Sequence, residues 1–397
     1  MNSEVAVLGA GVIGLSIAWR LAASGIKTIV IDGSASIPPA TTAAAGMLAP
    51  SFEEYHASED HDKKQLAASV THASLESLAM WGTFAEELSG VTDRSVDFQH
   101  SGTLGVAFDG REASVLEQQA FSARSYGLDA VLFSRDDVFA FEPGLSRSIV
   151  AGLYVKEEGQ VDPVQLLYGL RDAVERLGVV RINQIVDAIA CSENQPQNPI
   201  EITLANGEKI ETDQVVVATG ANGLPQGTRP SLSEFTPFVP VKGEAFSVEG
   251  LPLMPKCVVR GTTGYLCPKS DGRLVVGATE VPGASDLKPD EHGVKRLKQA
   301  ADRIFPSLAD YAVATAWAGV RPGTIDGAPV IGRLSDGAPR IVLALGHYRN
   351  GVLLAPWTAD KVRDLVMHAD AGNDTYGVFS PDRFVTENQQ ERMSSVC

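Results

Sequence analysis

A glycine-rich turn near the N-terminus constrains the fold of this chain more than any other feature. The sequence VAVLGAGVIGLSIAWRLAASGIKTIVID places a short apolar run, Val5–Leu8, before the turn and a helical pattern, Leu15–Ser24, after it. Gly25 has the position of a glycine that ends a helix, and a second apolar run, Thr28–Ile31, follows. This order predicts a strand, a tight turn, a helix and a second strand, which together open an α/β fold.

The turn itself, GAGVIG (9–14), matches the G-x-G-x-x-G pattern of dinucleotide-binding folds. Gly9 permits the tight turn, Gly11 lets the backbone approach a pyrophosphate, and Gly14 lets the helix pack closely on the strand. The N-terminus of the helix then supplies N–H groups and a partial positive charge. Asp32 closes the second strand, where an acid accepts hydrogen bonds from ribose hydroxyls and disfavours the 2′-phosphate of NADP. We therefore predict a dinucleotide site here.

Length and charge restrict the class of protein. A chain of 397 residues is long enough for two domains. Its formal net charge of −16 argues against nucleic acid and against an anionic membrane surface as partners. An anionic ligand must therefore be met by a local basic site.

Cysteine usage and the N-terminal residues indicate the compartment. The four cysteines form no CxxC pair and no Cys/His cluster at metal-ligand spacing, so we expect reduced thiols and no metal site. The start, Met1–Glu4, is acidic and lacks the basic region of a secretory signal. We expect a cytoplasmic protein.

A run of small residues, TTAAAGMLAP (41–50), stands where a nicotinamide dehydrogenase would continue its strand–helix alternation. Small side chains suit a backbone that lies flat against a ring system. With GAGVIGLSIAWRLA, this run resembles the glycine oxidase branch of the D-amino acid oxidase superfamily of FAD-dependent amine oxidases. The resemblance covers roughly residues 4–370, and its other matching stretches are FVPVKGEAFSV (238–248), GYLCPKSDGRLVVGAT (264–279), WAGVRPGTIDGAPVIGR (317–333) and GHYRNGVLLAP (346–356).

The resemblance implies FAD as the cofactor. A second signature, ETDQVVVATGANG (211–223), contains a strand, Val215–Val217, that ends in Ala-Thr-Gly, as is typical of FAD domains in this superfamily. The GVRPGT region holds no cysteine for covalent attachment of flavin, so we expect noncovalent FAD. The predicted FAD-binding residues are Gly9, Gly11, Val12, Ile13, Gly14, Asp32, Gly33, Thr41, Thr42, Gly46, Met47, Leu48, Val186, Thr219, Gly220, His347, Tyr348, Arg349, Asn350, Gly351, Val352 and Leu353.

Strand-rich stretches alternate with helical ones along the chain and predict two discontinuous domains. Ser114–Ser122 and Val164–Leu177 read as helices. We expect a Rossmann-type α/β FAD-binding domain and a substrate-binding domain built on a mainly antiparallel β-sheet. The predicted boundaries are 1–85, 145–225 and 320–370 for the FAD domain, 86–144 and 226–319 for the substrate domain, and 371–397 for a disordered C-terminal tail.

Two residues are the best candidates for binding a substrate carboxylate. Arg321 lies between an apolar run and a Pro-Gly turn, and its guanidinium offers a carboxylate two parallel donors. Its counterpart in the family binds the substrate carboxylate. Tyr265, in GYLCP, has a counterpart that lines the same site, and its hydroxyl is a donor.

The stretch GHYRNGVLLAP interrupts apolar sequence with polar groups. The family places this loop against the flavin, with Arg349 near substrate and ring, and His347 and Tyr348 packed around the ring. A helix that starts near Val352 would point its N-terminus at the pyrimidine edge, where reduced flavin carries negative charge. The polarity is then explained by burial under a cofactor.

Three positions depart from the family or extend its pocket. Glu280 stands where glycine oxidases often carry Met, and Thr263 stands where they often carry His. Arg260 lies just upstream and could meet a second carboxylate. Glu280 either holds a cationic amine or turns outward. These departures leave glycine, sarcosine and a dicarboxylic amine such as iminodiacetate as candidate substrates.

The resemblance implies oxidation by hydride transfer from the α-carbon to flavin N5. The imine is then hydrolysed to a glyoxylate-type aldehyde and an amine, and O₂ is reduced to hydrogen peroxide. The first alternative is a D-amino acid dehydrogenase that uses another electron acceptor. The second is a catalytically silent flavin-bearing subunit. A homo-oligomer is possible on the family pattern.

Overall fold

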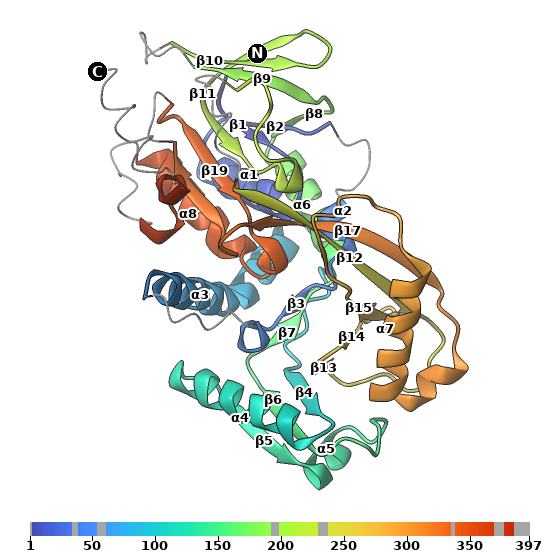
Figure 1. Ribbon diagram of the computed structural model, residues 1–397. Helices are drawn as coiled ribbons and strands as arrows, with labels where there is room; N and C mark the ends of the chain where they lie inside the picture. The colour runs from blue at the N-terminus through green and yellow to red at the C-terminus, as the bar shows by residue number, and fades with distance from the viewer. Residues whose placement is uncertain are drawn as a thin grey trace.

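The structure contains two large β-sheets that lie side by side, each with helices packed on it (Figure 1). A small sheet of β3 (Met47–Leu48) and β7 (Gly159–Gln160) lies between them (Figure 1). The computed structural model describes residues 2–33, 39–53, 61–191, 198–228, 237–334, 338–368 and 377–384.

The first sheet has a parallel centre. Its main path runs β18-β19-β11-β1-β2-β8, and every pair from β19 to β8 is parallel. β18, β9 and β10 add antiparallel pairs. The strands are β1 (Asn2–Leu8), β2 (Thr28–Ile31), β8 (Val180–Ile182), β9 (Val186–Ala190), β10 (Ile200–Leu204), β11 (Lys209–Val217), β18 (Val330–Arg333) and β19 (Ile341–Leu345).

The strand β1 shows why the parallel centre is apolar throughout. Val5 and Val7 point to one face and join the core under the helices, whereas Ala6 and Leu8 point to the other face and join a second core. A strand covered on both faces requires apolar residues at every position. The helices of this sheet are α1 (Val12–Ala23), α3 (His61–Thr92), α6 (Pro163–Arg176) and α8 (Ala355–Met367).

The second sheet is antiparallel except for the pair β13–β4. Its path runs β16-β12-β15-β14-β13-β4-β6-β5, and the long β17 also pairs with β12. The strands are β4 (Thr103–Ala107), β5 (Ala130–Ser134), β6 (Ala151–Val155), β12 (Phe238–Val248), β13 (Val258–Gly261), β14 (Gly264–Pro268), β15 (Leu274–Gly277), β16 (Val281–Pro282) and β17 (Thr315–Thr324).

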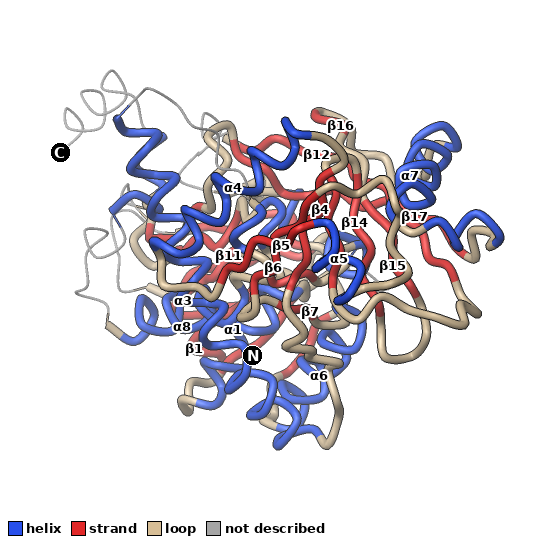
Figure 2. The backbone as a smooth tube through the Cα atoms, turned by 90° about the horizontal axis from the view of Figure 1, so that it is seen from below, coloured by secondary structure: helices blue, strands red, loops and turns tan. Residues whose placement is uncertain are grey.

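Helices α4 (Gly110–Ser125), α5 (Arg135–Phe141) and α7 (Glu291–Ile304) pack on the second sheet. In both views, α7 lies on the opposite side of the molecule from α3 and α8 (Figure 1 and Figure 2). The shorter elements are α2 (Pro39–Ala43), η1 (Pro50–Phe52), η2 (Gly220–Asn222), η3 (Pro306–Asp310), η4 (Tyr348–Asn350), η6 (Gly377–Phe379) and η7 (Pro381–Phe384).

The predicted fold class is confirmed, and several elements differ in length. The strand Thr28–Ile31 has the predicted bounds. The helix predicted over Ser114–Ser122 runs from Gly110 to Ser125, because Asp109 caps it by accepting a hydrogen bond from the Glu112 N–H at 2.9 Å.

The domain boundaries remain a prediction. Two strands, β6 and β17, do not follow the predicted division of the chain. β6 belongs to the antiparallel sheet, although the sequence assigned residues 145–225 to the FAD domain. The predicted boundary at residue 320 falls inside β17. This strand pairs with β12 over all ten of its residues, from Thr315 to Thr324, so it is not divided between two domains at that point.

The prediction of a disordered tail is wrong for Gly377–Phe384. Phe379 is buried and meets the Trp357 ring edge-on, with ring centroids 5.5 Å apart. Arg383 forms an ion pair with Asp326 at 2.7 Å. These two contacts fix the segment against α8 and the turn after β17. The rest of the predicted tail lies outside the described residues.

Candidate functional site

A cavity of about 1300 Å³ opens where the two sheets meet. Its walls include the carboxyl ends of β1, β2, β11 and β19 and the facing parts of β12, β13, β14 and β17. Ligands of α/β proteins bind outside the carboxyl ends of the parallel strands. Pockets for small ligands measure about 300–1,000 Å³, so this cavity has room for a ligand of dinucleotide size.

The glycine-rich turn forms one end of the cavity. Gly9 has φ +104°, and a Cβ there would lie 2.4 Å from the Ala218 oxygen. A Cβ at Gly14 would lie 2.0 Å from the Gly9 oxygen, so α1 approaches the turn as closely as a glycine allows. Asp32 Oδ2 accepts a hydrogen bond from the Ala10 N–H at 2.5 Å, which holds the acid beside the turn.

The N-terminus of α1 faces this end of the cavity through Gly11, Val12 and Ile13. In the described chain, the N-cap Gly11 makes no side-chain cap and the first turn carries no acid. The Val12 N–H donates to Thr41 Oγ1 at 3.1 Å. The partial positive charge of the helix is therefore available to an anion in the cavity. The diphosphate of FAD fits this arrangement.

The small-residue run is fixed from behind by a buried lysine. Lys269 Nζ donates to the Ala45 oxygen at 2.6 Å and to the Val161 oxygen at 3.0 Å. A Cβ at Gly46, which has φ +78°, would lie 2.1 Å from the same Val161 oxygen. The backbone of this run therefore lies between β7 and the cavity, with no space for a side chain at Gly46.

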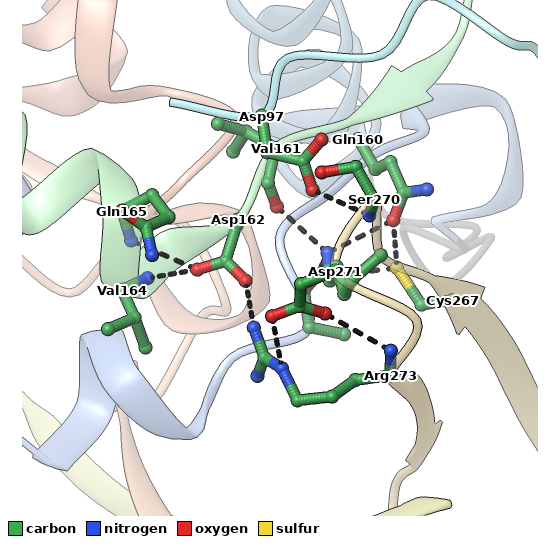
Figure 3. Close-up of polar contacts among 12 residues, drawn as sticks. Asp97, Gln160, Val161, Asp162, Val164, Gln165, Cys267, Ser270, Asp271 and Arg273 are labelled. Atoms are coloured by element: carbon green, nitrogen blue, oxygen red, sulfur yellow. Dashed lines mark hydrogen bonds and ion pairs between the residues drawn. The ribbon is translucent and has the colours of Figure 1, made fainter. Parts of the chain in front are cut away.

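Asp162, at the start of α6, links this helix to the second sheet through polar contacts (Figure 3). Asp162 caps α6 by accepting hydrogen bonds from the Val164 and Gln165 N–H groups at 2.8 and 3.0 Å. Its other oxygen meets Arg273 at 2.6 Å, so the β14–β15 hairpin is fastened to the start of α6 (Figure 3). These contacts join the helix α6 of the first sheet to the second sheet.

Most of the predicted FAD-binding residues line this one cavity. Within the described chain, three of them are absent from its lining: Gly14, Thr42 and Leu48. Gly14 packs on the turn, and Leu48 is fully buried in β3. The members that line the cavity are Gly9, Gly11, Val12, Ile13, Asp32, Gly33, Thr41, Gly46, Met47, Val186, Thr219, Gly220, His347, Tyr348, Arg349, Asn350, Gly351, Val352 and Leu353.

The loop 346–354 is polar and largely buried. His347 is 3% exposed, and its Nε2 lies 3.0 Å from Thr358 Oγ1. Burial lowers the pKa of His347 to about 3, so the ring is neutral at physiological pH. The Leu353 oxygen accepts hydrogen bonds from Ser77 Oγ at 2.6 Å and Trp81 Nε1 at 2.9 Å. The Leu353 carbonyl is thus satisfied by side chains of α3.

The helix after this loop begins later than predicted. α8 starts at Ala355, and the prediction of a start near Val352 is wrong by three residues. The segment 348–354 instead forms the 3₁₀ helix η4 and a series of turns. Pro356 sits at the first turn of α8, where its missing N–H and fixed φ suit a helix start.

Arg321 stands on β17 at the other end of the cavity. Its Nη1 donates to the Thr279 oxygen at 3.2 Å and more weakly to the Lys242 oxygen at 3.5 Å. A Cβ at Gly243 would lie 2.3 Å from Nη1, so this glycine leaves the space that the guanidinium occupies. Among the described residues, Arg321 forms no ion pair with a carboxylate within 4.0 Å. Burial lowers the pKa of Arg321.

Tyr265 stands on β14 and faces the same end of the cavity. A Cβ at Gly277, its partner on β15, would lie 2.2 Å from the Tyr265 hydroxyl oxygen. Burial raises the pKa of Tyr265 to about 12 against the opposing effect of Arg321. The phenol is therefore a neutral hydrogen-bond donor at physiological pH.

Arg349 and Arg260 are held by two carboxylates. Glu280 forms an ion pair with Arg349 Nη2, which settles the direction of Glu280: it turns toward the arginine. Glu53 lies 2.9 Å from Arg260 and 3.6 Å from Arg349, each distance joining a carboxylate oxygen to a guanidinium nitrogen. Burial lowers the pKa of Arg349, but Glu53 and Glu280 outweigh it and raise the pKa overall.

Glu53 is a site residue that sequence reasoning missed. It follows η1, and its two arginine partners lie about two hundred or more positions away in the chain. No local pattern marks it, apart from its place just after the small-residue run. Thr263 also lines the cavity, at the exposed turn between β13 and β14.

The residues that the structure describes contain no group of three or more His, Cys, Asp or Glu side chains that could hold a metal ion. None of the helices that they form is long and apolar enough to cross a membrane.

Comparison with known proteins identifies similar chains. Residues 4–365 match the model of the family described as FAD dependent oxidoreductase, abbreviated DAO. The chain is 31% identical over 395 residues to a bifunctional protein ThiO/ThiG of Synechocystis, with 97% of this chain and 54% of the relative covered. It therefore spans about half the length of that relative.

Two further relatives are covered almost completely. A glycine oxidase of Bacillus licheniformis is 29% identical, with 96% of this chain and 97% of the relative covered. The crystal structure of glycine oxidase from Geobacillus kaustophilus superimposes with a TM-score of 0.82 at 28% identity. That superposition covers 92% of this chain and 95% of the other.

Proposed function

Because the chain belongs to the FAD dependent oxidoreductase family, we propose that it oxidises glycine or a small N-substituted glycine, such as sarcosine or an iminodiacetate-like amine. The resemblance read from the sequence is confirmed at the level of this family. FAD would be held by the turn Gly9–Gly14 and the loop 346–354, and it would supply a hydride acceptor at N5 and a route for the electrons to O₂, which gives hydrogen peroxide. The imine product is hydrolysed to a glyoxylate-type aldehyde and an amine.

The observation that carries this proposal is the position of Arg321. A half-buried guanidinium with only carbonyl partners among the described residues is suited to an incoming carboxylate. Tyr265, whose neutral hydroxyl faces the same end of the cavity, is a second donor to that carboxylate. Two donors fix the substrate's orientation, and orientation is the main contribution a protein makes to cofactor chemistry.

Other polar side chains lie near Arg321 and Tyr265 in the cavity lining. Glu280 and Arg349 form an ion pair in the cavity lining, and Thr263 adds a hydroxyl group to it. His347 is neutral and is hydrogen-bonded to α8, so we do not assign it a role in proton transfer. A substrate amine that binds in its neutral form requires no general base at the α-carbon.

Anaerobic mixing with candidate substrates tests the proposal. The holoenzyme is mixed separately with glycine, sarcosine, iminodiacetate and D-alanine, and flavin absorbance near its visible maximum is followed. Bleaching by a glycine-type substrate, with peroxide on admission of air, supports the proposal. Bleaching without peroxide identifies a dehydrogenase with another acceptor. Absence of bleaching by every compound identifies a silent flavin-bearing subunit.

Replacing Tyr265 with Phe is expected to lower kcat/KM for the best substrate by about 10- to 100-fold, because a hydrogen bond to a charged group contributes about 1.5–3 kcal/mol. The pKa of about 12 means that ionisation of Tyr265 should leave no inflection in the pH profile near neutrality. Steady-state kinetics of both chains measure the effect.

Tyr154→Phe is the matched control for this substitution. Tyr154 lies on β6 of the same sheet, and its hydroxyl donates to the Ser101 oxygen at 3.1 Å. It does not line the cavity, within the residues described, so its loss should leave kcat/KM unchanged. Equal activity of Tyr265→Phe and the parent chain would remove Tyr265 from the carboxylate site.

We expect the FAD to be held without a covalent bond. Acid precipitation of the holoenzyme should release all of the yellow colour into the supernatant and leave a white pellet. Absorbance of the two fractions at the flavin maximum measures this. Colour that stays with the precipitated protein after washing would contradict the prediction.

A further inference from the structure

We propose that Glu53 limits this site to substrates with a single carboxylate, by occupying two arginines that would otherwise hold a second one. The inference rests on the proposed function, because it assumes that the substrate's first carboxylate binds at Arg321. It narrows the range of proposed substrates, because the sequence alone allows a dicarboxylic amine as well as glycine and sarcosine. Glu53 then acts as a specificity-determining residue.

The geometry of Glu53 is that of a bridging carboxylate. Its Oε1 lies 2.9 Å from Arg260 Nη1, and its Oε2 lies 3.6 Å from Arg349 Nη1. Each oxygen therefore faces a different guanidinium, which is how a substrate carboxylate would divide itself between the same two arginines. The Glu53 side chain is only 13% exposed, so water screens these contacts weakly.

The two arginines stand beside the proposed carboxylate site. Arg260 on β13 is directly opposite Tyr265 on β14 in the sheet register. Arg349, Glu53 and Arg321 line the same cavity. Arg260 is also packed over the Phe52 ring, with Cζ 5.8 Å from the ring centroid, which restricts its movement away from Glu53. A dicarboxylic substrate anchored at Arg321 would direct its second carboxylate toward this group.

The balance of charge decides which substrates fit. Arg260, Arg321 and Arg349 carry three positive charges, and Glu53 and Glu280 carry two negative charges. One positive charge is left, at Arg321, and one substrate carboxylate neutralises it. A second carboxylate would meet arginines that are already paired and would lie near the Glu53 anion. In a poorly screened pocket, two like charges without separate partners are strongly disfavoured.

Removing Glu53 should convert the arginine pair into a second anion site. For Glu53→Ala, we expect the ratio of kcat/KM for iminodiacetate to kcat/KM for glycine to rise by about 10- to 100-fold. Glu53→Gln removes the charge and keeps the volume, so it should raise the ratio by a smaller factor. The dissociation constant of malonate relative to acetate, titrated by perturbation of the flavin spectrum, should fall in parallel without any turnover.

Two further variants separate this role from a structural one. Glu280→Gln removes the other negative charge but leaves Glu53 on both arginines, so its ratio should rise much less than that of Glu53→Ala. Adding Arg260→Met to Glu53→Ala should abolish the gained activity toward iminodiacetate. Thermal unfolding and the flavin spectrum of each variant verify that the chain has folded and bound its cofactor.

The outcomes also distinguish this inference from the proposed function. If the parent chain oxidises glycine-type substrates and Glu53→Ala lowers activity toward both substrates equally, the specificity role is wrong and the function stands. If the parent chain oxidises iminodiacetate as well as it oxidises glycine, the specificity role is also wrong. If no glycine-type compound bleaches the flavin of the parent chain, the proposed function is wrong. The ratio of the malonate and acetate dissociation constants then still tests whether Glu53 excludes a second carboxylate.

Discussion

Replacing Arg321 with Met is expected to lower kcat/KM for the best substrate by about 10²- to 10⁴-fold. The loss of one partner of a buried, hydrogen-bonded charge pair costs about 2–5 kcal/mol or more, and every 1.4 kcal/mol is about tenfold. Arg321 is the guanidinium in the cavity that lacks a carboxylate partner among the described residues, so the substrate carboxylate would be left unpaired in its absence. Steady-state and anaerobic single-turnover kinetics measure the effect.

Stability measurements distinguish this loss from misfolding. Burial lowers the pKa of Arg321, which means that the folded chain holds its charge at a cost. Replacing an unpaired buried charge with an apolar side chain of similar length is often neutral or stabilising. We therefore expect Arg321→Met to bind FAD normally and to unfold at a temperature equal to or above that of the parent chain.

A graded series makes the assignment sharper. Arg321→Lys keeps the charge but loses the two-pronged fork, so its activity should lie between those of the parent chain and the Met variant. Added guanidinium ion should partly restore turnover to Arg321→Ala, where the side chain leaves an open space. Turnover by the Met variant at the rate of the parent chain would place the substrate carboxylate elsewhere, with Arg349 as the next residue to replace.

Local periodicity explains why the turn at one end of the cavity was predictable. The turn at Gly9–Gly14, the helix behind it and the strand that ends at Asp32 are contiguous, so their geometry depends mainly on neighbouring residues. In the polar loop, His347 is buried against α8, and burial of the loop under a cofactor stays a prediction. The predicted helix start was wrong because Pro356 and the 3₁₀ turn η4 move the first regular turn of α8.

Contacts between distant segments explain what was missed. Glu53 pairs with Arg260 and Arg349 across separations that no sequence pattern encodes. The tail was predicted to be disordered, yet Phe379 packs on Trp357, and Arg383 binds Asp326 and the Ala328 oxygen of the folded chain. Single contacts of this kind depend on the tertiary fold and have no period along the chain.

Replacing Gly9 with Ala is expected to destabilise the chain by about 2–6 kcal/mol and to lower FAD affinity by at least about 10²-fold. A residue other than glycine at φ +104° costs about 1–3 kcal/mol, and overpacking adds about 1–3 kcal/mol. The added Cβ would lie 2.4 Å from the Ala218 oxygen. Both segments are held by backbone hydrogen bonds, from Gly9 to Ile31 and from Ala218 to Leu8, so neither moves easily.

Gly25→Ala is the control for backbone strain alone. Gly25 has φ +84°, but no atom lies within 4 Å of the position that its Cβ would take. It should lose about 1 kcal/mol of stability and keep its FAD affinity, because it ends α1 at the far side from the cavity. Urea unfolding of the apoprotein and titration of FAD by fluorescence measure the two quantities separately.

Gly11→Ala then tests whether the turn is shaped for a ligand or only for the fold. Gly11 has an ordinary φ of −75°, and a Cβ there would meet only Thr41 Oγ1, at an acceptable 3.5 Å. The protein itself thus tolerates a side chain at this position, whereas a pyrophosphate close to the backbone would not. We expect apoprotein stability to change by less than about 1 kcal/mol and FAD affinity to fall by about 10- to 100-fold. Unchanged affinity would mean that FAD approaches the turn less closely than the glycine pattern implies, and that only Gly9 and Gly14 are required, for packing.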